Sequence, residues 1–143
     1  MTDTTHALTT GGPDSGLDER LGKELDAFNK EASGCAPEEF TVRVDDAEGN
    51  LVGGLSGWTW GDRAGIALLW VREDSRRDGW GGRLLAAAEA QAAARGCRSI
   101  MVSSFTFQAP AFYARHGYEE TARIPGFPGG HEDVYLLKPL EAS

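Results

Sequence analysis

The fold of this 143-residue chain is decided by residues 68–85, which read Leu68-Leu-Trp-Val-Arg-Glu-Asp-Ser-Arg-Arg-Asp-Gly-Trp-Gly-Gly-Arg-Leu-Leu85. The stretch begins in the apolar run 66–71, which is typical of a central strand covered on both faces. A loop rich in arginine and glycine follows at 75–82. Residues 83–95 are dominated by Ala and Leu and are followed by a glycine, which predicts a helix. A strand that leads through such a loop into a helix favours an anion-binding site at the loop.

The composition of the loop supports this interpretation. Glycines at 79, 81 and 82 remove side chains, so backbone N–H groups can face outward, and the N-terminus of the following helix adds about half a positive charge. Four guanidinium groups lie within twelve residues, on Arg72, Arg76, Arg77 and Arg83. Because arginine pairs with phosphate through two parallel hydrogen bonds, a phosphate-bearing cofactor is the expected partner. The alternative is a glycine-rich turn with solvated arginines.

Two familiar phosphate-binding motifs do not fit the spacing. No Lys-Ser or Lys-Thr pair follows the glycines, which excludes a P-loop. The loop also follows the fourth predicted element rather than a first strand with an acidic residue about 20 positions further on, which argues against a Rossmann dinucleotide site.

The rest of the chain predicts one α/β (α+β) domain, over residues 17–143, after a flexible N-terminal tail at residues 1–16. Apolar residues at three- and four-residue spacing predict an amphipathic helix from Leu17 to about Gly34. The further elements that we expect are strands at 40–44, 51–55, 66–71, 99–103 and 134–137, and a short helix at 110–116. The first two strands form a hairpin around a turn at 45–50.

Composition and charge restrict the function. The chain is 41% hydrophobic and 25% charged, with no apolar run of membrane-spanning length and no signal-peptide pattern at its N-terminus, so we expect a soluble cytoplasmic protein. Cys35 and Cys97 are too few and too far apart for a metal cluster or a disulfide framework, so no metal is expected. The net charge is −8, and residues 1–50 hold 12 acidic against 4 basic residues. This distribution argues against nucleic-acid binding and leaves room for a cationic small molecule.

Two motifs resemble those of the Gcn5-related N-acetyltransferases (GNAT). Arg76-Arg-Asp-Gly-Trp-Gly81 resembles the family's Arg/Gln-x-x-Gly-x-Gly/Ala signature, and Phe112-Tyr-Ala-Arg-His-Gly-Tyr118 resembles its Tyr-x-x-x-Gly-Phe/Tyr segment. Residues 107–113 and 128–131 resemble a branch that acts on small molecules. The resemblance covers about 17–140. It implies a mixed, mostly antiparallel sheet flanked by helices, acetyl-CoA-dependent transfer of an acetyl group to a primary amine, and a possible homodimer.

The resemblance also implies roles for individual residues. Tyr113 is expected to act as the general acid, since a phenol with a pKa near 10 can donate a proton at neutral pH. At Val71 a β-bulge would turn a backbone N–H toward the thioester oxygen. Gln108 stands where many relatives have Asn against the pantetheine arm. The expected coenzyme-binding residues are Leu69, Val71, Arg76, Arg77, Asp78, Gly79, Trp80, Gly81, Gly82, Arg83, Gln108 and Phe112.

The acceptor site is predicted from aromatic and acidic residues. We expect Trp58, Trp60, Phe105, His131 and Glu132 to form a site for a cation with a flat or apolar body, with core packing as the alternative for the two tryptophans. Many relatives carry an acid on the central strand, but Ala67 stands where we would expect it. The base is then His131, Glu132, Asp133 or a water chain, or none is needed.

Three other functions stay open on the sequence. The missing carboxylate on the central strand favours a coenzyme A-binding module that has weak catalysis or none. A protein N-terminal or lysine acetyltransferase fits the same motifs, because one fold hosts many acceptors. A structural protein with exposed aromatic residues would bind no coenzyme.

Overall fold

The computed structural model describes residues 6–141 of the chain. Residues 1–5 of the predicted tail lie outside that range. Residues 6–14 are exposed and form neither helix nor strand, and the first helix begins at Ser15.

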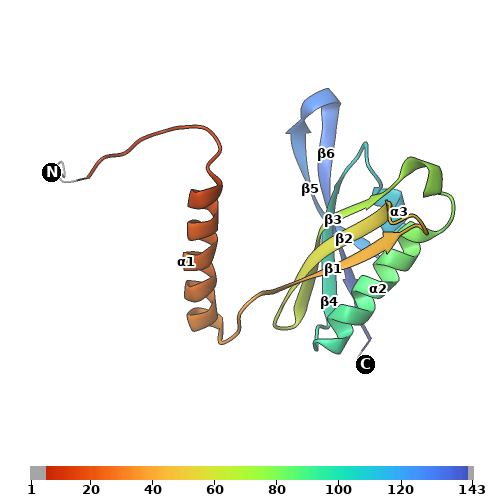
Figure 1. The fold of residues 1–143 in the computed structure, drawn as a ribbon, viewed down its shortest axis with the longest axis horizontal. Coiled ribbons are helices and arrows are strands. Elements are labelled where there is room, and N and C mark those ends of the chain that lie inside the picture. The colour runs from red at the N-terminus through yellow and green to blue at the C-terminus, as the bar shows by residue number, and fades with distance from the viewer. Residues whose placement is uncertain (1–5, 142–143) are drawn as a thin grey trace.

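The architecture is a mixed sheet with helices, as the sequence predicts. The strands lie in the order β1-β2-β3-β4-β6-β5, and every neighbouring pair is antiparallel except β3 with β4 (Figure 1). The strands are β1 (Glu38–Asp45), β2 (Leu51–Trp60), β3 (Arg63–Val71), β4 (Ser99–Phe105), β5 (Glu119–Phe127) and β6 (His131–Pro139). The helices are α1 (Ser15–Ser33), α2 (Trp80–Ala94) and α3 (Pro110–Arg115), with short 3₁₀ turns at Glu73–Ser75 and Pro128–Gly130.

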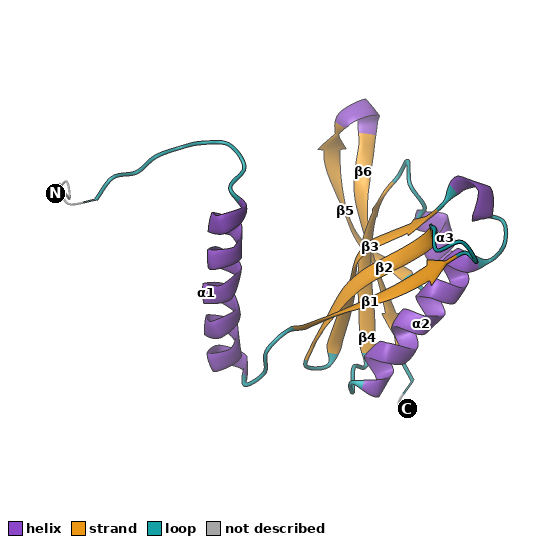
Figure 2. Cartoon of the chain, viewed as in Figure 1, coloured by secondary structure: helices purple, strands orange, loops and turns teal. Residues whose placement is uncertain are grey.

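The core lies between the sheet and α2. This helix buries Leu84, Leu85, Ala88 and Ala92, and Ile100 of β4 and Val134 of β6 are fully buried with them. A Cβ at Gly53 of β2 would lie 3.2 Å from the Leu84 side chain, so the glycine lets the helix approach the strand closely. The chain crosses from β3 to the parallel β4 through α2 (Figure 2), and this connection places the N-terminus of α2 beside the end of β3.

Strands β3 and β4 pair over only three residues and then separate. The parallel ladder joins Arg63, Ala64 and Gly65 to residues 99–101, and no pairing continues beyond Gly65. The pairing of β3 with β2 is also interrupted, because Ser56 opposes Leu68 while Gly57 opposes Ile66. The bulge therefore lies at Ala67, not at Val71 as the sequence analysis expected. The result is a fork whose arms are the last residues of β3 and of β4.

One strand was missed, and several boundaries differ from the sequence predictions. The edge strand β5 was not predicted, because its residues are exposed from Glu119 to Gly126 and so show no alternation of apolar and polar residues. Helix α2 begins at Trp80 rather than at Arg83, since Gly79, with φ of 80°, is the residue that caps it. Strand β2 continues from Leu55 to Trp60.

The prediction that the central strand is covered on both faces was wrong. Helix α2 covers one face of β1–β3, and the opposite face is open: Leu68 is 72% exposed and Trp70 is 48% exposed. Helix α1 does form, and it ends at Gly34 in the left-handed conformation, as predicted. It stands apart from the sheet, and none of its residues is buried (Figure 1).

Candidate active site

The mouth of the fork is a groove of about 760 Å³. The end of β3 forms one wall, through Leu69, Trp70 and Val71. The β4–α3 loop and α3 form the opposite wall, and the glycine-rich loop with the first turn of α2 closes one end. The residues that line the groove are Leu69, Trp70, Val71, Arg76, Arg77, Gly79, Gly81, Gly82, Phe107, Gln108, Ala109, Phe112, Arg115 and His116.

The free edge of β3 presents backbone hydrogen-bonding groups to this groove. Backbone groups of successive strand residues point to alternate edges, and the N–H of Arg72 donates to Val52 of β2 at 2.7 Å. The groups of Leu69 and Val71 therefore point to the other edge, where β4 has separated from β3. The carbonyl of Val71 accepts a hydrogen bond from Arg76 Nε at 2.9 Å. The remaining groups of these two residues are available to a ligand in extended conformation.

The first turn of α2 supplies further donors at the end of the groove. Its first intrahelical bond runs from the N–H of Arg83 to the carbonyl of Gly79, so the N–H groups of Trp80, Gly81 and Gly82 precede it. No side chain caps this end of the helix. Together with the positive end of the helix dipole, these N–H groups form a site suited to a phosphate group.

The glycines of this turn also let α3 approach α2. A Cβ at Gly81 would lie 3.2 Å from the Phe112 ring, and one at Gly82 would lie 3.0 Å from the His116 ring. The two rings pack against each other, with centroids 4.8 Å apart. A side chain at either glycine would push α3 away, so these positions control the width of the groove.

The predicted arginines have different environments. Arg72 forms ion pairs with Asp46 at 3.4 Å and Asp74 at 2.7 Å. The hydrogen bond from Arg72 lowers the pKa of Asp74, whereas the pKa of Asp46 is lowered mainly by the backbone N–H of Asn50 and to a smaller extent by Arg72. Arg72 therefore fixes the loop rather than facing a ligand. The Arg83 guanidinium lies 4.1 Å from the centroid of the Trp80 ring.

The guanidinium of Arg77 is available to contact a ligand in the groove. It lines the groove, is exposed and makes no hydrogen bond or ion pair within residues 6–141. Asp78, also exposed, gives the loop a backbone hydrogen bond to Ser75.

Tyr113 lies at the base of α3, and its ring belongs to the core. The residue is 7% exposed and packs edge-on against Phe112 and Tyr118. Its hydroxyl makes no hydrogen bond to any described residue. Every fully buried side-chain oxygen or nitrogen in the described part of the chain does have a hydrogen-bond partner, so the Tyr113 oxygen is not fully buried. The oxygen therefore keeps some access to solvent. Burial raises the pKa of the Tyr113 hydroxyl, which keeps its proton in place.

Gln108 closes the turn that follows β4. Its side-chain oxygen accepts the backbone N–H of Phe105 at 2.8 Å. The backbone N–H of Gln108 donates to the carbonyl of Phe105, also at 2.8 Å. The amide NH₂ group is left for a ligand, because the oxygen is already engaged and the residue lines the groove.

Three of the residues predicted for the acceptor meet beyond this turn. Phe105 stacks on Phe107 and packs edge-on against Phe127, and Phe107 in turn contacts the ring of His131. The Nδ1 atom of His131 lies 2.8 Å from Thr106 Oγ1, which also accepts the N–H of Glu132. Glu132 is paired with Arg123 at 3.5 Å. An aromatic wall and a carboxylate thus lie side by side.

Trp58 and Trp60 lie elsewhere. They occupy the half of β2 next to the β2–β3 turn, whereas the groove is at the other end of β3. The Trp58 indole covers Gly65, and Trp60 Nε1 donates to the carbonyl of Cys35 at 2.8 Å. The geometry therefore agrees with packing, the alternative reading of these two residues.

The groove also contains residues that the sequence analysis did not select. Arg115 and His116 lie three and four positions after Phe112, so helical spacing could have placed all three on one face.

Within residues 6–141 no group of three or more potential metal ligands is brought together. No helix of the described chain is long and apolar enough to cross a membrane.

Comparison with known proteins agrees with this geometry. The model of the acetyltransferase (GNAT) family matches residues 7–118. The blasticidin-S acetyltransferase of Streptomyces morookaense is 44% identical over 107 residues, which are 72% of this chain and 76% of the relative. A crystal structure of an acetyltransferase from Bacillus cereus superposes with a TM-score of 0.76 at 32% identity, over 93% of this chain and 98% of that one.

A second solved structure shares the fold. An acetyltransferase from Bacillus anthracis, in complex with acetyl coenzyme A, superposes with a TM-score of 0.64 at 19% identity, over 72% of this chain and 63% of that chain. The matched family region spans β3, the glycine-rich loop, α2 and α3. The chain therefore belongs to the GNAT family and is an N-acetyltransferase.

Proposed function

We propose that this enzyme transfers the acetyl group of acetyl-CoA directly to a primary amine of a small cationic molecule. The observation that carries the proposal is the groove at the fork. It joins free backbone groups of β3, an uncapped helix N-terminus and an unpaired arginine, and Tyr113 directly follows the groove-lining Phe112 in α3. We also assign the enzyme to the cytoplasm, in keeping with its two free cysteines.

The residues of the groove fit the chemistry of the coenzyme. The N–H groups of residues 80–82 and the guanidinium of Arg77 would hold the pyrophosphate, since both favour negative charge. The backbone of Leu69 and Val71 and the amide of Gln108 would hydrogen-bond the pantetheine arm. Phe112, whose ring lines the groove, would pack against its apolar part.

The chain's own groups would then assist transfer. Bound acetyl-CoA supplies an activated acetyl thioester with sulfur as the leaving group. As the amine nitrogen bonds to the acetyl carbon and the carbon–sulfur bond breaks, Tyr113 would donate its hydroxyl proton to the leaving sulfur, and the proton released from the nitrogen would restore the Tyr113 hydroxyl through solvent. A backbone N–H at the free edge of β3 would stabilise the carbonyl oxygen. We assign no covalent enzyme intermediate, because Cys97 is buried and neither cysteine lines the groove.

The acceptor would bind against Phe105, Phe107 and Phe127, with Glu132 balancing its positive charge. The Thr106 hydroxyl accepts the N–H of Glu132, so its own hydrogen is available to His131 Nδ1. With the Thr106 hydroxyl donating to Nδ1, the ring would carry its proton on Nε2 and would orient the acceptor by donating a hydrogen bond from that atom. Ala67 offers no carboxylate at the bulge, and the amine would lose its proton to solvent. The similarity to a blasticidin-S acetyltransferase supports an antibiotic amine as the acceptor.

A thiol-release assay with acetyl-CoA tests this function. The panel should contain blasticidin S, an aminoglycoside, a peptide with a free N-terminus and a lysine peptide. We expect release with a small cationic amine and little with either peptide. Turnover confined to the peptides would identify a protein acetyltransferase. Coenzyme binding without turnover on any amine would identify a catalytically inactive binding module.

A further inference from the structure

Helix α1 carries an apolar stripe that is left exposed. Leu17, Leu21, Leu25 and Phe28 lie on one face at helical spacing, and they are between 50% and 68% exposed. The helix has 19 residues, including the poor helix former Gly22. Because most helical stability in proteins comes from packing of the amphipathic face, we expect the stripe to pack on a surface.

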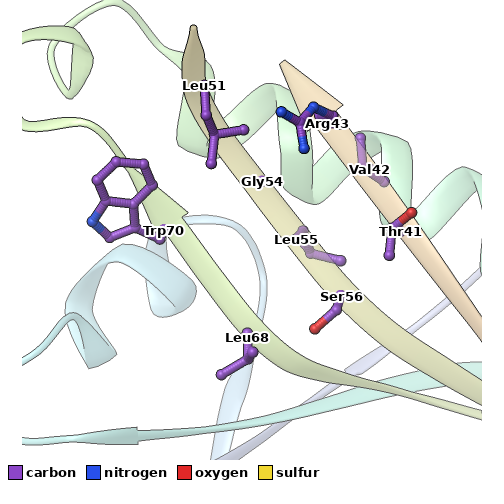
Figure 3. A pocket seen from close by; sticks show the side chains of 9 residues that line it. All are labelled: Thr41, Val42, Arg43, Leu51, Gly54, Leu55, Ser56, Leu68 and Trp70. Carbon is purple, nitrogen blue, oxygen red and sulfur yellow. The ribbon is translucent and has the colours of Figure 1, made fainter. Parts of the chain in front are cut away.

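The open face of the sheet offers such a surface. A groove of about 330 Å³ crosses β1, β2 and β3 on the face opposite α2 (Figure 3). Its exposed apolar side chains are Leu51, Leu68 and Trp70. Gly54 and Ser56 are small, so they leave space at the floor of the groove. The charged residue among those that line it is Arg43. Arg43 is paired with Asp45 at 2.9 Å, and Glu24 of α1 is paired with Arg20 at 3.0 Å, so the complementarity of helix and groove rests on their apolar side chains.

The anchor of α1 directs it away from its own groove. Trp60 Nε1 bonds to the carbonyl of Cys35 and to Ser33 Oγ, which fixes the C-terminal end of α1 at the β2–β3 turn. The groove lies toward the opposite end of β2 and β3, at Leu51 and Trp70. To reach it, α1 would have to turn about the linker at 34–37 and fold back over the sheet, away from the position that it has in the structure (Figure 1). A helix from a second molecule needs no such change.

The solved relative is consistent with α1 as a regular part of the fold. The superposition on the Bacillus cereus acetyltransferase covers 93% of this chain, which leaves too few residues uncovered to omit the whole of α1. An extended position of this helix is therefore compatible with the arrangement of a crystallised protein.

We propose that two copies of this chain form a dimer by exchanging α1, so that the stripe of each copy packs into the β1–β3 groove of the other. The interface is isologous: each copy supplies one helix and one groove, and the pairing closes after two copies. Because Trp70 lines both this groove and the coenzyme groove, the exchanged helix would lie next to the active site.

The mass of the full chain in solution, by sedimentation velocity or light scattering, tests the exchange with four proteins. The wild type should have the mass of two 15.3-kDa chains. Leu25→Glu places a charge in the stripe, and Leu68→Glu places one in the groove; each should give single chains. Lys23→Glu adds acid on the opposite face of α1 and should remain a dimer. Both leucines are exposed, so circular dichroism should confirm that each variant folds.

Each other outcome overturns the proposal. A wild type with the mass of one chain would show that α1 stays unpaired or folds back on its own sheet. A Leu25→Glu dimer would place the interface elsewhere. Single chains for Leu25→Glu but a dimer for Leu68→Glu would show that two stripes pair with each other, without the groove. Loss of the dimer in Lys23→Glu would show that charge on α1, not the stripe, decides association.

Discussion

Helices α1 and α2 are the two long helices of this chain, and their surroundings are opposite. Helix α2 buries four residues against the sheet, and its first turn lines the groove that we assign to the coenzyme. Helix α1 is longer and buries none. The comparison teaches that amphipathic spacing establishes that a helix forms, but not which molecule supplies its partner. We place α2 in catalysis and α1 in assembly, and the predictions that follow test this division.

The largest effect is expected at the catalytic end. Tyr113→Phe should lower turnover by about 10- to 10,000-fold with coenzyme binding nearly intact, the range for loss of a general acid. Tyr135→Phe, on β6 and not on α3, is the matched control and should keep wild-type turnover. Steady-state kinetics with a competent amine would measure both. Unchanged turnover in Tyr113→Phe would remove this residue from the proton-donor role.

The second effect compares the two helices directly. Leu85 of α2 is 0% exposed, so Leu85→Ala should lower the free energy of unfolding by about 2–5 kcal/mol. Leu21 of α1 is 50% exposed, so Leu21→Ala should cost less than about 0.5 kcal/mol in dilute protein. Its cost should rise with protein concentration if α1 packs on a second copy. Urea unfolding at two concentrations would measure this, and equal losses for both variants would contradict the comparison.

Arg77→Ala should weaken acetyl-CoA binding by about 10- to 100-fold, since it removes a charge-assisted hydrogen bond to phosphate. Arg20→Ala removes the same charge from α1, where Arg20 pairs with Glu24, and should leave binding unchanged. Calorimetric titration of both variants would separate a local contact from a general effect of charge. An equal loss in both would disprove the assignment of Arg77.

The smallest effect concerns pH. Burial raises the pKa of the Tyr113 hydroxyl above its ordinary value near 10, so the proton donor stays protonated through that pH. At pH values below 10, turnover should therefore increase with pH as the acceptor amine loses its proton, and it should show no decrease in that range. A fall with a midpoint below 10, present in the wild type and absent in Tyr113→Phe, would show a lowered pKa and contradict this environment.

The regions that could be predicted are those whose signal is local. Gly79 and its neighbours gave the loop and helix α2, because a glycine-rich turn is visible in sequence. Strand β5 could not be found, since an edge strand that buries neither face has no periodic pattern. The open face of β3 was missed because an apolar run does not show which element, if any, covers it.

The site shows the same limit. The spacing of residues 76–83 predicts a coenzyme loop, but it could not show that Arg72 is engaged by Asp46, a residue 26 positions away. Trp58 and Trp60 were assigned to the acceptor because alternation gives a face and not a position along the sheet. Only the register of β2 on β3 places them at the far end.

The measurement that tests the central claim most directly is thermal unfolding of the wild-type protein with acetyl-CoA, beside adenosine diphosphate and NAD as controls. Acetyl-CoA at about 100 times its dissociation constant should stabilise the fold by about 2.7 kcal/mol, which is a shift of several degrees at this size. We predict a shift well beyond that of either control. No shift with acetyl-CoA, or the same shift with all three ligands, would contradict the assignment of the groove at the fork of β3 and β4 to the coenzyme.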